Sequence, residues 1–213
     1  MRSPVSDTRA PGSGRRVLDL GCGSRKVPGT LGVDVRRAPD VDLLADVARL
    51  PFADGSIDGI VTRHTLEHVD DMLTVVEECW RVLRPGGLLK VVMPNASCTF
   101  TSWLDPTHRR ALFIESFQYF EPRNPLRYYS RARFETVYAR LHLTSSHQWD
   151  QRWRWPRRVL TAVAEAVANR SRWSQYLAER FWGHWIGGFE EMTVVLRAIK
   201  EPQASPSHAM EAP

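Results

Sequence analysis

The sequence predicts an α/β domain built on a largely parallel β-sheet with helices on its faces. Strand-like runs alternate with helical runs along most of the chain, which is the pattern of parallel strands joined by crossover helices. A buried strand runs directly into a glycine turn in "VLDLGCG", as it does in ligand-binding α/β proteins. The 213 residues, 43% of them hydrophobic, indicate one sizeable domain rather than two.

Five runs in the first half of the chain have the composition of strands. In chain order they are "RVLDLG", "TLGVDV", "VDLLADV", "IDGIVTRH" and "LLKVVMPN". A helix is expected between the last two, in "DMLTVVEECWRVLRPGG", because apolar residues recur there at spacings of three and four. These residues are Met72, Val75, Val76, Cys79, Trp80 and Leu83. Gly86 and Gly87, just past Pro85, are expected to end the helix.

The second half of the chain is expected to be mainly helical. "YYSRARFETVYARLHL" predicts a helix capped by Ser130, and residues 157–168 form an Ala- and Val-rich helical run. A further helix would carry an aromatic face with a repeat of four: Trp173, Leu177, Phe181 and Trp185. The segment from about 149 to 186 holds six of the eight tryptophans: Trp149, Trp153, Trp155, Trp173, Trp182 and Trp185. It could pack on the sheet, or form a lid, a dimer contact or a membrane-docking surface.

The two ends of the chain are expected to lie outside the folded domain. Residues 1–14 and 201–213 are rich in Pro, Ser, Gly and Ala, which predicts loose tails around a domain spanning 15–200. The first segment lacks the apolar core of a signal peptide, and no run approaches the ~18 apolar residues of a membrane span. The cysteines at 22, 79 and 98 show no CxxC spacing. We therefore expect a cytoplasmic protein without a zinc or redox motif and without a bound metal.

The glycine turn after the first strand departs from the dinucleotide-binding pattern GxGxxG. Gly21 and Gly23 fit, but Lys26 stands where a third glycine would let strand and helix pack closely. The phosphate-loop ending GKS or GKT is absent. Gly21 and Asp34 are only thirteen positions apart, whereas a helical crossover usually needs a dozen or more residues besides the strands. We expect the first crossover to be a loop or a single helical turn, with Lys26 pointing to a ligand or to solvent.

Acidic residues end the second and third strand runs, where ligands of parallel sheets bind. A carboxylate at Asp34 is suited to accept hydrogen bonds from ribose hydroxyls, although it could equally form a turn or cap a helix. Asp46 could accept from an exocyclic adenine amine, and the Val47 amide could bind a ring nitrogen. These residues predict an adenosine site at one edge of the sheet.

Five motifs in this order resemble the class I S-adenosylmethionine (SAM)-dependent methyltransferases, in the small-molecule branch often labelled type 11. They are "VLDLGCG", "GVDV", "ADVARLPFADGSIDGIV", "HTLEHV" and "RVLRPGGLLKVVMPN", within residues 16 to about 98. "DPTHRRALFIESFQYF", residues 105–120, is similar to relatives with the same shortened first turn. The resemblance implies a Rossmann-like sheet of seven strands with the last strand antiparallel, and "EMTVVLRAIK" fits that last strand.

The resemblance also implies which residues bind SAM. The methionine end would be lined by the glycine turn: Asp19, Gly21, Cys22 and Gly23. The backbone around Arg63 and His64 would meet the amino-acid end of the cofactor, and Lys26 could meet its carboxylate. Arg25 stands where the family motif has its last glycine. SAM carries no phosphate, so this turn need not be a phosphate cradle.

Methyl transfer needs a nucleophile aligned with the methyl group and, for many acceptors, a group that takes a proton. Candidates are His64, Glu67 and His68 in "HTLEHV", and Asp105 and His108 in "DPTH". We expect His108, supported by Asp105, to act as the base or to anchor the acceptor. A structural hydrogen bond is the other interpretation of each histidine, and it suits His68 best because a helix begins nearby.

These features predict methyl transfer from SAM to a small organic acceptor with an aromatic or apolar body. The net charge of +5 is mild, although most of it lies after residue 108. Methylation of a lipid-linked or macromolecular acceptor at a membrane or nucleic-acid surface is an alternative. Nucleic acid is disfavoured, because "TRHTLEHV" replaces the NPPY-like motif of base-amine methyltransferases. An NAD(P)-dependent oxidoreductase, with Arg36 and Arg37 reading a 2′-phosphate, is a further alternative. The chain is expected to be a monomer or a homodimer.

Overall fold

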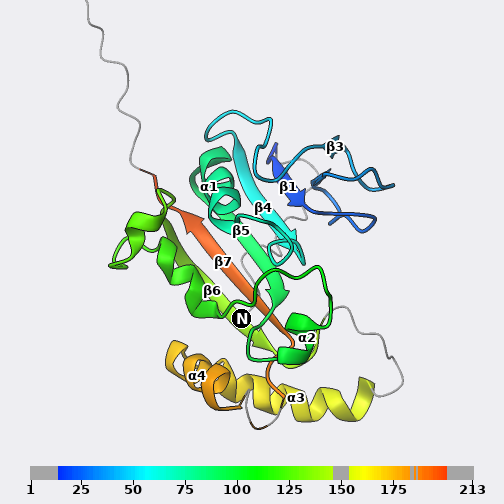
Figure 1. Cartoon of the computed structure of the whole chain (residues 1–213), viewed down its shortest axis with the longest axis vertical. Helices are drawn as coiled ribbons and strands as arrows, with labels where there is room; N and C mark the ends of the chain where they lie inside the picture. The colour runs from blue at the N-terminus through cyan, green and yellow to red at the C-terminus, as the bar shows by residue number, and fades with distance from the viewer. Residues whose placement is uncertain (1–13, 146–153, 183–184, 186, 201–213) are drawn as a thin grey trace, which may run out of the picture.

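The computed structural model describes residues 14–145, 154–182, 185 and 187–200, and for residues 154–160 it describes the backbone only. Its central feature is a seven-stranded sheet of order β3-β2-β1-β4-β5-β7-β6 (Figure 1). The strands are β1 Val17–Leu20, β2 Leu31–Asp34, β3 Leu43–Leu44, β4 Ile57–Arg63, β5 Leu83–Pro94, β6 Phe134–His142 and β7 Glu191–Ala198. β1 to β5 run parallel, whereas β7 is antiparallel to both β5 and β6. The expected seven-stranded Rossmann-like sheet with an antiparallel last strand is confirmed.

The first crossover between strands is a loop, as expected from its length. Residues 21–30 contain turns and no helix. Gly21 adopts a left-handed backbone conformation (φ 68°), and a side chain there would meet the Thr65 hydroxyl at 2.2 Å. The Gly21 amide donates to the carbonyl of Val33 at 2.8 Å. The turn therefore lies tightly between the ends of β1, β2 and β4, which only a glycine at position 21 permits.

The helix before β5 is shorter than the sequence predicts. α1 spans Met72–Val82, and the Asp71 side chain caps it by accepting from the Thr74 amide. Its buried face consists of Val75, Val76, Cys79 and Val82. The helix ends at Val82 and not at the glycine pair, because Pro85 keeps the residue before it out of the helical region. Leu83 is already extended and begins β5.

The segment predicted as a helix capped by Ser130 is strand β6, so that prediction was wrong. Val137 has no partner in β7, because the register shifts between Thr136 and Tyr138. Phe134 lies opposite Ala198 and Leu141 lies opposite Met192. These partners are six residues apart, so both buried side chains point to the same face although they are seven residues apart in β6. The extra residue gives the strand an apolar spacing that resembles that of a helix.

The helical segment after β6 contains α3 Arg154–Ala168 and α4 Arg172–Leu177, followed by a π-helical turn, η3, at Ala178–Trp182. Both helices expected here are confirmed, although the second continues as a π-helix. In Figure 1 they lie beside the end of β6 and the start of β7. Trp149, Trp153, the terminal segments 1–13 and 201–213 and the side chain of Trp155 lie outside the described part of the chain.

Three short helices connect β5 to β6. They are α2 Thr99–Trp103, the 3₁₀ helix η1 Ile114–Phe120 and the 3₁₀ helix η2 Arg127–Tyr129. η1 buries Ile114, Phe117 and Phe120 in the same core as the sheet residues Leu18, Ile60 and Leu89. This packing fixes the loop between α2 and η1, which carries Asp105 and His108, against the end of β5.

Candidate functional site

The carboxyl ends of β1, β2 and β4 bring the residues of the expected cofactor site together. Asp19 in β1 is fully buried. Its Oδ2 accepts hydrogen bonds from the Val27 amide at 2.7 Å and from Arg63 Nη2 at 3.0 Å. Its Oδ1 is buried and accepts no hydrogen bond from any described residue. A buried carboxylate oxygen without a donor is costly, so Asp19 offers an acceptor to a cationic or N–H group of a ligand.

Asp34 ends β2 beside the glycine turn, as expected. Its Oδ2 accepts from the Gly23 amide at 3.0 Å, and its Oδ1 accepts from the Arg36 amide at 2.9 Å. The carboxylate is half-buried and each of its oxygens can accept a further hydrogen bond. The turn thus holds the Asp34 carboxylate in a fixed position at the edge of the sheet.

The residues expected to bind adenine follow β3. Asp46 is exposed and its Oδ1 accepts from the Ala48 amide at 2.8 Å. Val47 is half-buried and packs against the core. Cys22, in the glycine turn, is buried, and this burial together with Asp19 and Asp34 raises the pKa of its thiol to about 11. The thiol is therefore neutral near pH 7 and contributes packing rather than nucleophilic chemistry.

Lys26, which is expected to point to a ligand or to solvent, is paired with Asp42. Its ammonium nitrogen lies 2.6 Å from Asp42 Oδ2, and that hydrogen bond raises the pKa of Lys26. The Asp42 carboxylate also accepts from the Gly32 amide in β2, which holds the ion pair against that strand. Arg63 is the last residue of β4. Its guanidinium contacts Asp19 and the carbonyl of Arg25, while its buried Nε donates to no described residue.

His64 lies between two buried carboxylates. Its backbone is left-handed (φ 51°), which turns the chain sharply after β4. His64 Nε2 lies 3.0 Å from Glu191 Oε2, and Nδ1 lies 3.4 Å from Glu67 Oε1. Burial alone would lower the pKa of His64, but the hydrogen bond to Glu191 and the ion pair with Glu67 raise it to about 9. An imidazolium engaged on both sides has no lone pair, so His64 is unsuited to be the base near pH 7.

Glu191 was missed in the sequence, although a signal was available. The last strand is antiparallel, so its first residue lies at the edge where the parallel strands end. Glu191 is the first residue of β7 and pairs with Pro94, the last residue of β5. An acidic residue at the start of an antiparallel last strand is therefore a candidate for this site.

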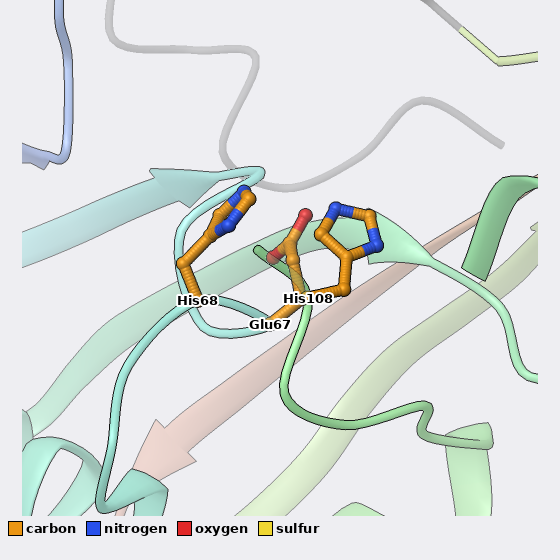
Figure 2. A group of neighbouring side chains, drawn as sticks. All are labelled: Glu67, His68 and His108. Carbon is orange, nitrogen blue, oxygen red and sulfur yellow. The ribbon is translucent and has the colours of Figure 1, made fainter. Parts of the chain in front are cut away.

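Glu67, His68 and His108 form a second cluster at the same edge. Each residue has one ring nitrogen or carboxylate oxygen that lies within 4.8 Å of the corresponding atoms of the other two. The Glu67 carboxylate lies between the two imidazole rings (Figure 2). The rings themselves make an edge-to-face contact with their centroids 4.7 Å apart. Glu67 is fully buried, and neither of its oxygens accepts a hydrogen bond from a described residue.

Asp105 does not contact the ring of His108, so the support expected between them needs correction. The Asp105 carboxylate accepts from the Thr107 amide at 2.8 Å and from the Thr107 hydroxyl at 2.7 Å. These hydrogen bonds lower the pKa of Asp105. The Thr107 hydroxyl in turn lies 2.9 Å from His68 Nδ1, whereas His108 Nδ1 lies 2.8 Å from the carbonyl of Ser102. Asp105 thus orients His68 through Thr107, and the end of α2 orients His108.

A large hollow lies at the opposite edge of the sheet. Its volume is about 700 Å³, and its lining includes Gly55 before β4, Pro85 near the start of β5, and Ile199 after β7. These positions mark the amino ends of the parallel strands. Ligands of parallel α/β sheets bind at the carboxyl ends, so this hollow is not assigned to the cofactor.

The strand order, with its antiparallel last strand, matches Rossmann-like methyltransferase folds. A family model described as "Methyltransferase domain" matches residues 18–91. A SAM-dependent methyltransferase structure from Methanosarcina mazei superposes with a TM-score of 0.55, covering 94% of this chain and 99% of that chain at 16% identity. That likeness shows the fold.

Relatives that match part of the chain are SAM-dependent methyltransferases by name or description. A probable SAM-dependent methyltransferase from Mycolicibacterium smegmatis is 37% identical over 122 residues, which are 47% of each chain. A demethylmenaquinone methyltransferase from Beutenbergia cavernae is 37% identical over 108 residues, 42% of this chain and 45% of that protein. The match thus spans about half the length of these relatives. The chain is thus similar to SAM-dependent methyltransferases over this part of its length, and the similarity implies SAM as the cofactor.

The described residues fit SAM. Asp19 Oδ1 has no donor among the described residues, which suits the ammonium group at the methionine end of SAM. A side chain added at Gly23 would enter open space, so the turn leaves room beside the Asp34 carboxylate. The site thus combines one buried acceptor, one half-buried carboxylate and a backbone turn without bulky side chains.

Proposed function

We propose that this chain transfers the methyl group of SAM to a small organic acceptor with an aromatic or otherwise apolar body. The observation that carries the proposal is the position of the Glu67–His68–His108 cluster at the same sheet edge as Asp19 and Asp34. The relative named demethylmenaquinone methyltransferase supports a small-molecule acceptor. The tryptophan-rich helical segment supports an apolar one, since aromatic walls recognise flat apolar groups.

The residues at the ends of β1, β2 and β4 would hold the cofactor. In this proposal Asp34 accepts from the ribose hydroxyls, and Asp46 and Val47 bind the adenine. Asp19 accepts from the ammonium group, and Arg63 replaces Lys26 as the partner of the carboxylate. When bound, SAM supplies an electrophilic methyl group, and the electron pair of its carbon–sulfur bond stays on sulfur.

His108 would take the proton of the acceptor or anchor it. The carbonyl of Ser102 can only accept a hydrogen bond, so His108 Nδ1 carries the proton. Its Nε2 therefore has a free lone pair. The acceptor heteroatom gains the methyl group and loses its proton, and His108 Nε2 is placed to receive that proton.

The helical segment is proposed as a lid over the acceptor pocket. Asn169 at the end of α3 exchanges hydrogen bonds with the backbone of Leu141 in β6. β6 is antiparallel to β7 and so parallel to β5. Its end therefore lies at the carboxyl edge of the sheet, the edge that also carries the cofactor residues. Closure over this edge would exclude water during transfer.

The first test is turnover of His108→Ala on a panel of small aromatic and apolar acceptors, measured as release of S-adenosylhomocysteine. Removal of a general base costs about 10²–10⁴ in rate, so turnover falls by that order while SAM affinity, measured by calorimetry, stays near wild type. Added imidazole partly restores turnover, which a merely structural histidine would not show. The control is His142→Ala, a half-buried histidine in β6 bonded to Thr193, which keeps turnover within a few-fold.

Three results would count against this proposal. Turnover of His108→Ala within a few-fold of wild type at saturating acceptor places the base elsewhere. Loss of SAM binding in the same variant makes His108 part of the scaffold. Efficient methylation of bulk RNA, with no activity on the small-molecule panel, would contradict the proposal of a small organic acceptor.

A lipid-linked acceptor at a membrane surface is the second candidate, and the exposed aromatic residues of the helical segment favour it. Trp173, Phe181 and Trp185 are 68%, 57% and 85% exposed. No described helix has the length and hydropathy of a membrane span, so contact would be peripheral. Sedimentation with anionic vesicles tests it: binding that is lost in the Trp173→Ala/Phe181→Ala variant supports this candidate, and no binding removes it.

A further inference from the structure

The Glu67–His68–His108 cluster has the composition of a metal site that the cysteine count did not predict. Two imidazoles and one carboxylate are the protein ligands of many catalytic zinc sites, which keep a fourth position open for water or substrate. The three side chains come from two segments, the turn after β4 and the loop between α2 and η1. Both segments lie at the edge of the sheet where the cofactor residues converge.

The tautomers of both histidines leave Nε2 of each ring available to bind a metal ion. His108 Nδ1 must donate, because its partner is the carbonyl of Ser102. His68 Nδ1 must donate as well, because the single proton of the Thr107 hydroxyl is given to the Asp105 carboxylate. Each Nε2 therefore carries a lone pair. Metal-binding histidines typically have this arrangement, with the other ring nitrogen donating to a carbonyl or to a carboxylate-linked group.

Glu67 adds an independent observation. Its side chain is 1% exposed, and neither oxygen accepts a hydrogen bond among the described residues. Oε1 lies 3.4 Å from His64 Nδ1, so His64 balances part of its charge. Oε2 makes neither a hydrogen bond nor an ion pair with any residue that the structure describes. A buried carboxylate oxygen between two imidazoles is costly unless a cation or a donor occupies the space.

We propose that Glu67, His68 and His108 bind one divalent cation of the zinc type. The N₂O donor set favours Zn²⁺ over Mg²⁺ or Ca²⁺, which prefer all-oxygen sites. Bonds of about 2.0–2.1 Å at tetrahedral angles place ligand atoms about 3.3 Å apart. The spacing of up to 4.8 Å in the cluster therefore closes by small rotations of the half-buried histidines. Asp105, Thr107 and Ser102 orient the ligands.

The inference deepens the proposed function and rests on it for its catalytic meaning. A bound cation would leave one position for the acceptor, so that a hydroxyl oxygen on it loses its proton more readily. His108 would then anchor the acceptor through the cation instead of receiving the proton. The acceptor class this favours is one with a hydroxyl or enol oxygen.

The test uses the full chain, stripped with a chelator and titrated with Zn²⁺ alone in a calorimeter. One Zn²⁺ is expected to bind per chain. His108→Ala and His68→Ala should each weaken binding by at least 10- to 100-fold, which is the loss typical for a residue that only orients a metal ligand. Thr107→Val, which removes only the orienting hydroxyl, weakens it about 10-fold. Cobalt(II) in place of zinc gives the strong visible absorption of a four- or five-coordinate ion. His142→Ala, a histidine outside the cluster, binds as wild type.

Equal Zn²⁺ binding by wild type and the His68→Ala/His108→Ala double variant would overturn the inference, because binding would then lie elsewhere. The absence of a one-to-one site would overturn it as well. Glu67→Gln could disturb the fold, so the half-buried histidines carry the test. The titration needs neither SAM nor acceptor, so it is independent of the methyltransferase assay. A chain that binds no Zn²⁺ but loses turnover in His108→Ala would keep the proposed function and lose the metal site.

Discussion

Asp34 shows how one residue serves both the fold and the site. Its carboxylate accepts from two backbone amides, which anchors the glycine turn, and still has acceptor capacity for a ligand. The position could be read from the sequence, since a strand pattern ending in an acidic residue after a glycine turn is specific. The side-chain hydrogen bonds could not, because they depend on how the turn folds back onto β2.

Replacing Asp34 with Ala is expected to weaken SAM binding. A charge-assisted hydrogen bond contributes about 1.5–3 kcal/mol, which corresponds to a roughly 10- to 150-fold loss in affinity. Calorimetry with SAM measures the change, and circular dichroism checks that the fold is kept. Asp54→Ala, at the opposite edge of the sheet beside Arg81, is the control and should bind normally. Unchanged affinity in Asp34→Ala would remove Asp34 from the site.

Variants of Arg63 and Lys26 are expected to affect SAM affinity differently, because only Arg63 is proposed to bind the cofactor carboxylate. Arg63→Gln should lower SAM affinity about 10-fold or more, because it removes a charge-assisted hydrogen bond of about 1.5–3 kcal/mol. Lys26→Ala should stay within a few-fold, because the Lys26 ammonium is already paired with Asp42. Calorimetry of both variants under one buffer decides between them. A large loss in Lys26→Ala alone would restore the lysine as the carboxylate partner.

These cases show why the sequence predicts the positions of short side chains better than the partners of long ones. Strand ends place Asp19, Asp34 and His64 at the right edge, since backbone position determines most of what a short side chain can reach. A lysine in a loop reaches many partners, and only the tertiary position of Asp42 decides which one it takes. The expected pairing of Asp105 with His108 failed for the same reason, since Thr107 and Ser102 are nearer.

At the scale of elements, β6 is where the sequence pattern misled. The strands with uninterrupted apolar runs were all predicted, because a buried parallel strand has a simple composition. In β6 the unpaired residue Val137 breaks the alternation, and the resulting spacing is that of a helix. Pairing with β7, which is distant in sequence, makes this segment a strand. The local spacing of apolar residues carries no information on that pairing.

Deletion of Val137 should destabilise the protein far more than its replacement by Ala. Without the extra residue, Phe134 and Leu141 can no longer both point to the buried face, and exposing one such side chain costs about 2–5 kcal/mol. Val137→Ala keeps the register and should cost about 1 kcal/mol or less. Urea unfolding at equal protein concentration measures both. Similar stabilities for the deletion and the substitution would contradict the register argument.

At the scale of the whole molecule, the helical segment is joined to the sheet through a buried acidic residue. Glu179, in the π-helical turn, accepts from the Asn95 side-chain amide at 2.6 Å and from the Ile114 amide at 3.1 Å. Asn95 directly follows β5, and Ile114 begins η1. One carboxylate thus connects the proposed lid, the end of the sheet and the loop that carries His108.

The link through Glu179 predicts a pH dependence of stability. Burial raises the pKa of Glu179 to about 6, although the hydrogen bonds from Asn95 and Ile114 oppose this. The unfolded chain has the ordinary, lower pKa, so the folded state binds the proton more tightly. This contribution is fully present below the unfolded pKa and is lost as the pH rises through about 6. Wild type should therefore lose roughly 2 kcal/mol relative to Glu179→Gln between about pH 4 and pH 7. Urea unfolding of both proteins across this range gives the difference, and a constant difference would show that Glu179 has the same pKa in the folded and unfolded chains.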